Sequence, residues 1–158
     1  MILNKTIFAK SEINCVQTLL NSVGWLHQMR RNTMKFAIYQ IQITAAQRKT
    51  INESKNDFDS VPAFAAKIKM KMADADKIGG LASDAFDAGY YTHVANITAE
   101  DFDDCFEVGN VGPDDQIERI TVRMSSLSVG DVIVAEDGTV AVIDPVGFVA
   151  FDNSAIAA

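Results

Sequence analysis

Two runs of β-branched residues around an Asp-Gly dipeptide constrain the fold of this chain more than any other feature of its sequence. The runs occupy residues 132–134 and 140–143, and Asp137-Gly138 stands between them. An Asp-Gly pair between such runs is the strongest short-range signal of a β-hairpin, because both residues tolerate the positive φ angles of a two-residue turn. The sequence therefore predicts a β-hairpin at 131–144.

The predicted register of this hairpin places two carboxylates opposite each other. With a two-residue loop at 137–138, Asp131 faces Asp144 across the strands, and opposed like charges destabilise a sheet unless something compensates. One interpretation is a carboxylate pair that shares a proton or a cation. The favoured alternative is that the strands splay and each Asp caps a neighbouring turn through backbone N–H groups. No His, Lys or Ser is placed by the sequence to complete a catalytic set, so we predict no catalytic residue and no enzyme.

The remaining segments alternate between helical and extended patterns. In order they are a helix at 11–30, a strand at 34–43, a short helix at 45–51 capped by Thr44, a helical turn at 61–66 followed by a strand at 67–73, a turn with a short helix or loop at 77–89 closed by Gly89, a strand at 90–97, a helix at 98–109, a loop at 110–116 and an extended segment at 117–124. This order predicts an α+β fold: a single compact domain with a mixed or antiparallel sheet, the C-terminal hairpin and an N-terminal helical extension.

The expected domain covers residues 34–158, and the expected helical extension covers residues 1–33. Met34 opens a clean strand, so two interpretations of the extension stay open: a part of the natural product, or an appended segment. The strand at 34–43 carries apolar side chains on both faces, with Phe36 and Ile38 on one of them. This double-sided pattern predicts a central strand.

The stretch 61–73 carries two conflicting signals. Pro62 close to a Ser indicates the start of a helix, whereas alternating apolar and Lys residues over 67–72 indicate a half-exposed strand. We favour a helical turn followed by a strand with a lysine face. That face is interpreted as a solvated edge that discourages aggregation; a phosphate-binding stripe is the alternative, without a glycine loop to support it.

The helix at 98–109 has a full set of end signals. Thr98 is the expected cap, Glu100 and Asp101 suit the positive N-terminal end of a helix, and Gly109 is the expected stop. The acidic residues here lack the loop spacing and the glycine of an EF-hand, so a solvated helix start is favoured over a divalent-cation site.

The net charge of −7 hides a strong asymmetry along the chain. Residues 1–73 hold eleven Lys and Arg against four Asp and Glu, whereas residues 74–158 hold three against seventeen. This predicts one electropositive and one strongly electronegative region. The plain interpretation is solubility together with attraction between the two halves of the chain, and the sharper one is an acidic face that docks on a basic protein surface. The candidate partner-binding residues are Asp101, Asp103, Asp104, Asp114 and Asp115.

Several classes of protein and site are disfavoured by composition. No run approaches the 18 or more apolar residues of a membrane span, and the first eight residues lack the features of a signal peptide, so a cytoplasmic protein is expected. Cys15 and Cys105 form no CxxC motif, and neither His27 nor His93 has a Cys or His partner at ligand spacing. We therefore predict no metal site and no cofactor.

Three blocks of sequence point to a family. They are FAIYQ at 36–40, YTHV at 91–94 with the helix that contains Phe102 and Phe106, and SLSVGDVI at 126–133 continuing to DPVGF at 144–148. Together they resemble the YodL-like small domain, which occurs in phage, plasmid and conjugative-element proteins. The resemblance covers about residues 34–151 and is strongest at 125–148, while a longer loop before the acidic helix and the N-terminal helix depart from it. It implies an accessory role for a mobile element and carries over no catalytic residue.

The expected function is that of a phage or mobile-element accessory protein in the host cytoplasm. It binds a protein partner through the acidic face, and inhibition of a host defence or nucleic-acid enzyme is the specific form expected. We expect no direct contact with nucleic acid or membrane. The alternative is a structural or assembly subunit of a phage particle or complex that forms a homo-oligomer through the helix at 11–30.

Overall fold

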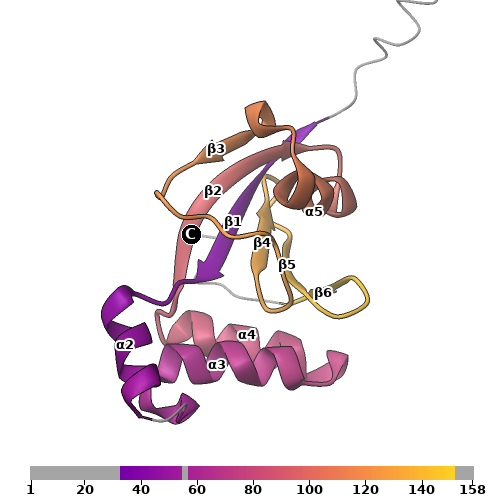
Figure 1. Cartoon of the computed structure of the whole chain (residues 1–158). Coiled ribbons are helices and arrows are strands. Elements are labelled where there is room, and N and C mark those ends of the chain that lie inside the picture. The colour runs from indigo at the N-terminus through magenta and orange to yellow at the C-terminus, as the bar shows by residue number, and fades with distance from the viewer. Residues whose placement is uncertain (1–32, 55–56, 152–158) are drawn as a thin grey trace, which may run out of the picture. The chain divides into compact units, whose positions relative to one another are not determined.

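An antiparallel sheet is the framework of the residues that the structure describes, 33–54 and 57–151 of the computed structural model (Figure 1). Every neighbouring pair of its strands runs antiparallel. In the order in which they lie side by side, the six strands are β3 (Ile117–Arg119), β2 (Tyr91–Ala99), β1 (Met34–Ile41), β4 (Val132–Ala135), β5 (Val140–Ile143) and β6 (Phe148–Ala150).

Four α-helices and two short 3-10 helices complete the described part of the chain. They are α2 (Ala45–Glu53), η1 (Phe58–Ser60), α3 (Pro62–Met72), α4 (Ala75–Asp87), α5 (Phe102–Val111) and η2 (Asp114–Gln116). The predicted α+β fold with an antiparallel sheet is therefore confirmed. The predicted helix at 11–30 and the extension at 1–33 lie outside the described residues.

The two faces of the sheet are covered by different helices. One core joins α5 to the face that carries Phe36, Ile38 and Ile133, and a second core joins α3 and α4 to the face that carries Ile41 and Val132. Successive side chains of a strand point to opposite faces, so one strand serves both cores. The central position predicted for β1 is confirmed, because β1 lies between β2 and β4. Figure 1 shows α3 and α4 side by side near one end of the strands and α5 toward the other end.

The helix α2 begins where the sequence predicted. Thr44 Oγ1 accepts a hydrogen bond from the backbone N–H of Gln47 (3.2 Å), and Gln47 Oε1 accepts one from the backbone N–H of Thr44 (2.9 Å). This reciprocal capping box satisfies two backbone donors that a helix N-terminus otherwise leaves unpaired. The first turns of α2, which carry Arg48, therefore have a fixed starting point.

The strand predicted at 67–73 is wrong, because these residues continue the helix α3. Pro62 occupies the first helical turn, where its fixed φ and missing N–H are tolerated. Ala63, Ala66 and Met70 recur at i, i+3 and i+7 and pack into the same core as α4. Side chains two positions apart diverge around a helix, so the three lysines of this stretch do not share the single face expected of a strand.

The segment predicted as a turn with a short helix or loop at 77–89 forms the longer helix α4. Gly79 lies inside it, and a Cβ at this position would meet Val149 and Phe151 at 3.5 Å. These are ordinary van der Waals distances, so α4 lies close to the C-terminal segment at this point. Gly89 follows the helix with a φ of 71°, the left-handed conformation that suits a residue just past a helix end.

The helix predicted at 98–109 is present, but it starts later. Thr98 belongs to β2, and the cap of α5 is Asp101, whose Oδ1 accepts a hydrogen bond from the backbone N–H of Asp104 (2.9 Å). A pairing partner on β1 keeps Thr98 extended, since Thr98 lies opposite Lys35 in the sheet. Tertiary pairing therefore overrides the capping preference of Thr98.

The end of α5 also differs from the prediction. Gly109, the expected stop, lies inside the helix, where a Cβ would come within 2.5 Å of Leu127 Cδ1. The helix ends at Gly112, which has a φ of 83°. Gly109 is therefore needed for close packing, and Gly112 supplies the conformation that leaves the helix.

The predicted hairpin at 131–144 is present as β4 and β5, with a register that differs by one residue. Val134 pairs with Val140, so the loop has three residues, 136–138, rather than two. Gly138 has a φ of 88°, in the left-handed region that the last residue of a three-residue hairpin loop usually adopts. The extended segment predicted at 117–124 forms a strand only over the three residues of β3. The N–H groups of Ile120 and Thr121 still donate to the carbonyl oxygen of Val94, and the chain then runs as a loop toward β4.

Candidate functional site

Asp131 is a buried carboxylate directly before β4, with 1% of its surface exposed. Its Oδ2 accepts hydrogen bonds from Gln40 Nε2 (2.8 Å) and from the backbone N–H of Ser128 (3.0 Å). Burial raises the pKa of Asp131, and the hydrogen bond from Gln40 acts in the opposite direction. The cations of Lys67 and Lys71 also favour the charged form. Asp131 therefore holds both the turn that begins at Ser128 and, through Gln40, the end of β1.

Gln40, near the end of β1, uses every polar position of its amide. Its Nε2 donates to the carbonyl oxygen of Ser125 (3.0 Å) as well as to Asp131, and its Oε1 accepts from the N–H and the O–H of Ser125, both at 3.1 Å. A fully satisfied buried amide holds its partners in place, so the loop before β4 is tied to the sheet. Sequence reasoning did not select Gln40. The sequence does contain one indication that Gln40 is buried, because it lies two residues after Ile38 and therefore on the same face of the strand.

The predicted register that placed Asp131 opposite Asp144 is wrong. The backbone N–H of Ile143 donates to the carbonyl oxygen of Asp131 (2.9 Å), so Ile143 is the facing residue. Asp144 Oδ1 instead accepts from the backbone N–H groups of Val146 (2.8 Å) and Gly147. The candidate carboxylate pair therefore consists of two separate turn caps that share no hydrogen-bond partner.

Seven carboxylates without any cation occupy residues 100–116, and we name them the acidic surface: Glu100, Asp101, Asp103, Asp104, Glu107, Asp114 and Asp115. Some of them have structural partners. Asp104 Oδ2 accepts from the backbone N–H of Glu100 (2.8 Å), and Asp114 Oδ1 pairs with Arg119 Nη2 (3.0 Å). The predicted partner-binding residues therefore divide between the two ends of α5, with three at its N-terminal end and two in η2 beyond its C-terminal end.

Exposed apolar side chains accompany the acidic surface. Phe106 and Val111, both on α5, are 37% and 79% exposed. Ile120 and Val122 follow β3 and are exposed as well. Large apolar groups among polar residues are a common composition of protein-binding surfaces.

Three further kinds of site were considered among the described residues: a metal site, a reactive thiol and a membrane-spanning helix. In residues 33–54 and 57–151, no group of three or more His, Cys, Asp or Glu side chains is placed to hold a metal ion. Cys105 belongs to α5 and its thiol is buried in the core, and burial together with the charge of Asp104 raises its pKa to about 12. None of the described helices has the length and hydrophobicity of a membrane span.

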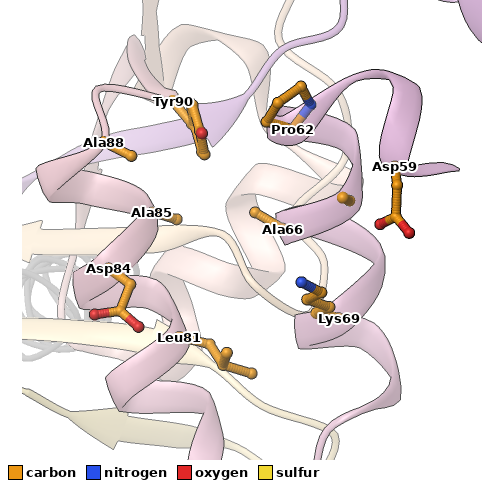
Figure 2. Close-up of a pocket in the computed structure, with 10 residues that line it drawn as sticks. Asp59, Pro62, Ala66, Lys69, Leu81, Asp84, Ala85, Ala88 and Tyr90 are labelled. Atoms are coloured by element: carbon orange, nitrogen blue, oxygen red, sulfur yellow. The ribbon is translucent and has the colours of Figure 1, made fainter.

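A pocket of about 410 Å³ lies between α3 and α4 (Figure 2). Short side chains leave this space open, and Figure 2 shows Ala66 and Ala85 on its two sides. Lys69 on α3 and Asp84 on α4 also line it. Sequence reasoning did not find this pocket, because the alanine spacing has a meaning only once residues 67–72 are assigned to a helix.

The chain was also compared with known proteins. No protein-family model, no curated protein and no solved structure matches it.

Proposed function

We propose that this domain is a non-enzymatic, protein-binding accessory module of a phage or mobile element, which acts in the host cytoplasm by docking its acidic surface on a basic protein. The observation that carries the proposal is the run of seven carboxylates without a cation over residues 100–116, together with the exposed Phe106 and Val111 on the same helix. A basic host enzyme of defence or nucleic-acid metabolism is the partner class that this surface fits.

The combination of charges and apolar groups has a physical rationale. A one-signed surface accelerates the encounter with a partner of opposite sign and disfavours other partners. Charge alone binds weakly, whereas a buried aromatic anchor supplies most of the affinity at many interfaces. Phe106 is the aromatic residue in a position to act in this way, since α5 carries it within the acidic surface.

The proposal of a non-enzymatic role is supported by the surroundings of the candidate reactive groups described above. Asp131 and Asp144 are both engaged in capping turns, and Cys105 is buried with a thiol pKa of about 12. Each of these groups therefore has a structural explanation.

Charge reversal at exposed positions tests the proposal. Asp103→Lys and Asp115→Lys change side chains that are exposed and cap no helix, so the fold should persist. The tagged double variant and the parent chain are used to capture proteins from a bacterial host lysate at low and moderate salt. We expect a basic protein captured by the parent to be lost by the variant.

The matched control is Asp76→Lys with Asp87→Lys, which places the same charge change on exposed positions of α4. This control should retain the captured protein. Capture that survives reversal of the acidic surface, or that is lost equally in both double variants, contradicts the proposal.

A further inference from the structure

Three cations line a second recess, at the end of β1 and away from the acidic surface. This recess has a volume of about 200 Å³. Arg48 comes from α2, Lys67 from α3 and Arg123 from the loop between β3 and β4, and all three side chains border the same space. Segments distant in sequence therefore bring positive charge to one point.

None of these three cations forms a salt bridge with a carboxylate of the described residues. The salt bridges there use other cations: Lys35 with Glu118, Lys49 with Glu53, Lys77 with Asp74 and Arg119 with Asp114. Lys67 Nζ instead donates to the carbonyl oxygen of Ile41 (3.1 Å), and Arg48 Nη2 lies 3.5 Å from that of Ile43. Backbone carbonyls orient these side chains but do not neutralise them.

The recess is also pre-organised. Two glutamines at the end of β1 hold the backbone of the loop at Arg123 and at Ser125. Gln42 donates to the carbonyl oxygen of Arg123, and Gln40 binds the backbone of Ser125. Holding a binding residue in place before the ligand arrives lowers the entropic cost of binding.

The cations match one ligand chemistry in particular. Two planar guanidinium groups and one ammonium provide the forked and point-like donors that phosphate oxygens accept. The three positive charges exceed the single negative charge of Asp131, which acts on Lys67 from the protein interior. A dianionic phosphate therefore suits the recess better than a carboxylate with one charge.

We propose that Arg48, Lys67 and Arg123 form a binding site for a phosphate group, carried by a phosphate monoester or present as inorganic phosphate. A neighbouring recess of about 320 Å³ shares Arg48 and Arg123 and is also lined by Ala45, Asn52 and the ion-paired Lys49 and Glu53. It offers space for the organic part of a monoester. The lysine stripe weighed from the sequence contributes only Lys67 to this site.

The test is a titration of the full chain followed by NMR, at constant ionic strength, with glycerol 3-phosphate, inorganic phosphate and acetate as probes. Saturable shifts are expected at the backbone amides of Arg48 and Arg123 with both phosphates, and acetate should bind at least about tenfold more weakly because it lacks the second charge. Tighter binding of glycerol 3-phosphate than of inorganic phosphate identifies a monoester site, whereas equal affinities identify a site for the phosphate group alone.

The variant Arg48→Gln with Arg123→Gln should weaken phosphate binding by about tenfold or more, because two charged donors are lost. The control Lys69→Gln removes an exposed cation of α3 that lies outside the recess and should leave the affinity unchanged. An unchanged thermal midpoint shows that the double variant is folded. Equal affinity for acetate and phosphate, or unchanged binding in the double variant, overturns the proposal. The protein-binding proposal uses a different surface and is unaffected by either result.

Discussion

The acidic surface and the cation recess are both built from charged side chains, yet they are organised in opposite ways. On the acidic surface, the carboxylates of Asp101 and Asp104 accept hydrogen bonds from backbone N–H groups at the N-terminus of their own helix. In the recess, the charged groups come from separate elements and are positioned by neutral amides and carbonyls, with Gln40 as the central residue.

This difference shows that local charge density and a built site are separate properties. A run of carboxylates around a helix start needs no tertiary structure to exist, because the helix supplies backbone donors within one turn. A convergent group of cations exists only if a loop and two helices are held together. The following substitutions compare how much the residues that support the recess and those that support the acidic surface contribute to the stability of the fold.

The largest effect is expected for Gln40→Ala. This change leaves the buried carboxylate of Asp131 and the backbone of Ser125 without their amide partner, and it opens a cavity at a fully buried position. We expect the free energy of unfolding to fall by about 3 kcal/mol, measured by urea denaturation. The control Gln42→Ala removes one bond at a less buried position and should cost about 1 kcal/mol or less. Equal losses for the two variants would show that Gln40 is not the centre of the network.

The next largest effect is expected for Gly109→Ala, which tests how the acidic helix is seated. The added Cβ would meet Leu127 Cδ1 at 2.5 Å, so we expect a loss of about 2 kcal/mol from overpacking. Gly80→Ala in α4 is the matched control, because no atom lies within 4 Å of its Cβ position. That change should instead stabilise the fold by about 0.5–1 kcal/mol, since alanine favours helix more than glycine does. Thermal unfolding distinguishes the opposite signs, and a gain of stability in both variants contradicts the packing described for Gly109.

A smaller effect is expected within the acidic surface itself. Asp101→Ala removes the side-chain cap of α5 and should cost about 1 kcal/mol. Asp103→Ala, two residues away and exposed, should change stability by less than about 0.5 kcal/mol. Urea denaturation of the two variants separates the roles of these neighbours. Similar values for both would place the helix cap elsewhere.

The smallest effect concerns the pH dependence contributed by Asp131. Because the pKa of this carboxyl is raised above its ordinary value of 3.8, the fold prefers the protonated form. The stability that it contributes is present below about pH 4 and is lost as the pH rises through the folded-state pKa. Asp131→Asn keeps an acceptor oxygen for Gln40 and Ser128 but does not ionise.

As the pH rises above about 4, the parent loses this contribution and the variant does not. The unfolding free energy of the variant should therefore increase relative to that of the parent, and the difference should become constant above the folded-state pKa. Denaturation curves at several pH values measure this difference. Other carboxylates, such as Asp137 with its lowered pKa, titrate in both proteins and cancel. Parallel pH profiles would mean that the carboxyl titrates alike in the folded and unfolded chains.

Much of the fold follows from local sequence patterns, because those patterns have a short range. The apolar residues on both faces of 34–43 predicted a central strand and the Asp-Gly dipeptide predicted a hairpin, and both are observed. The hairpin register was mispredicted because an Asp-Gly pair suits a two-residue loop as well as a three-residue one, and here Gly138 closes a loop of three residues in the left-handed conformation. The helix α3 was mispredicted because three alternating lysines imitate a strand, while its contacts with α4 are tertiary.

The candidate sites were predictable to different extents for the same reason. The acidic surface is contiguous in sequence and needed only a count of charges. The recess joins Arg48, Lys67 and Arg123 across 75 positions, and the amide that holds its loop, Gln40, is an ordinary residue until its partners are known. Convergence of this kind depends on the topology of the sheet, which sequence periodicity does not specify.

The brevity of the edge strands β3 and β6 has a consequence for recognition. Each spans only three residues, so β3 and β6 themselves present very short rows of main-chain donors and acceptors. A visiting peptide that adds itself as an extra strand needs a longer template than this. Strand addition at β3 or β6 is therefore disfavoured, and the same shortness protects neighbouring copies from joining edge to edge at these two strands.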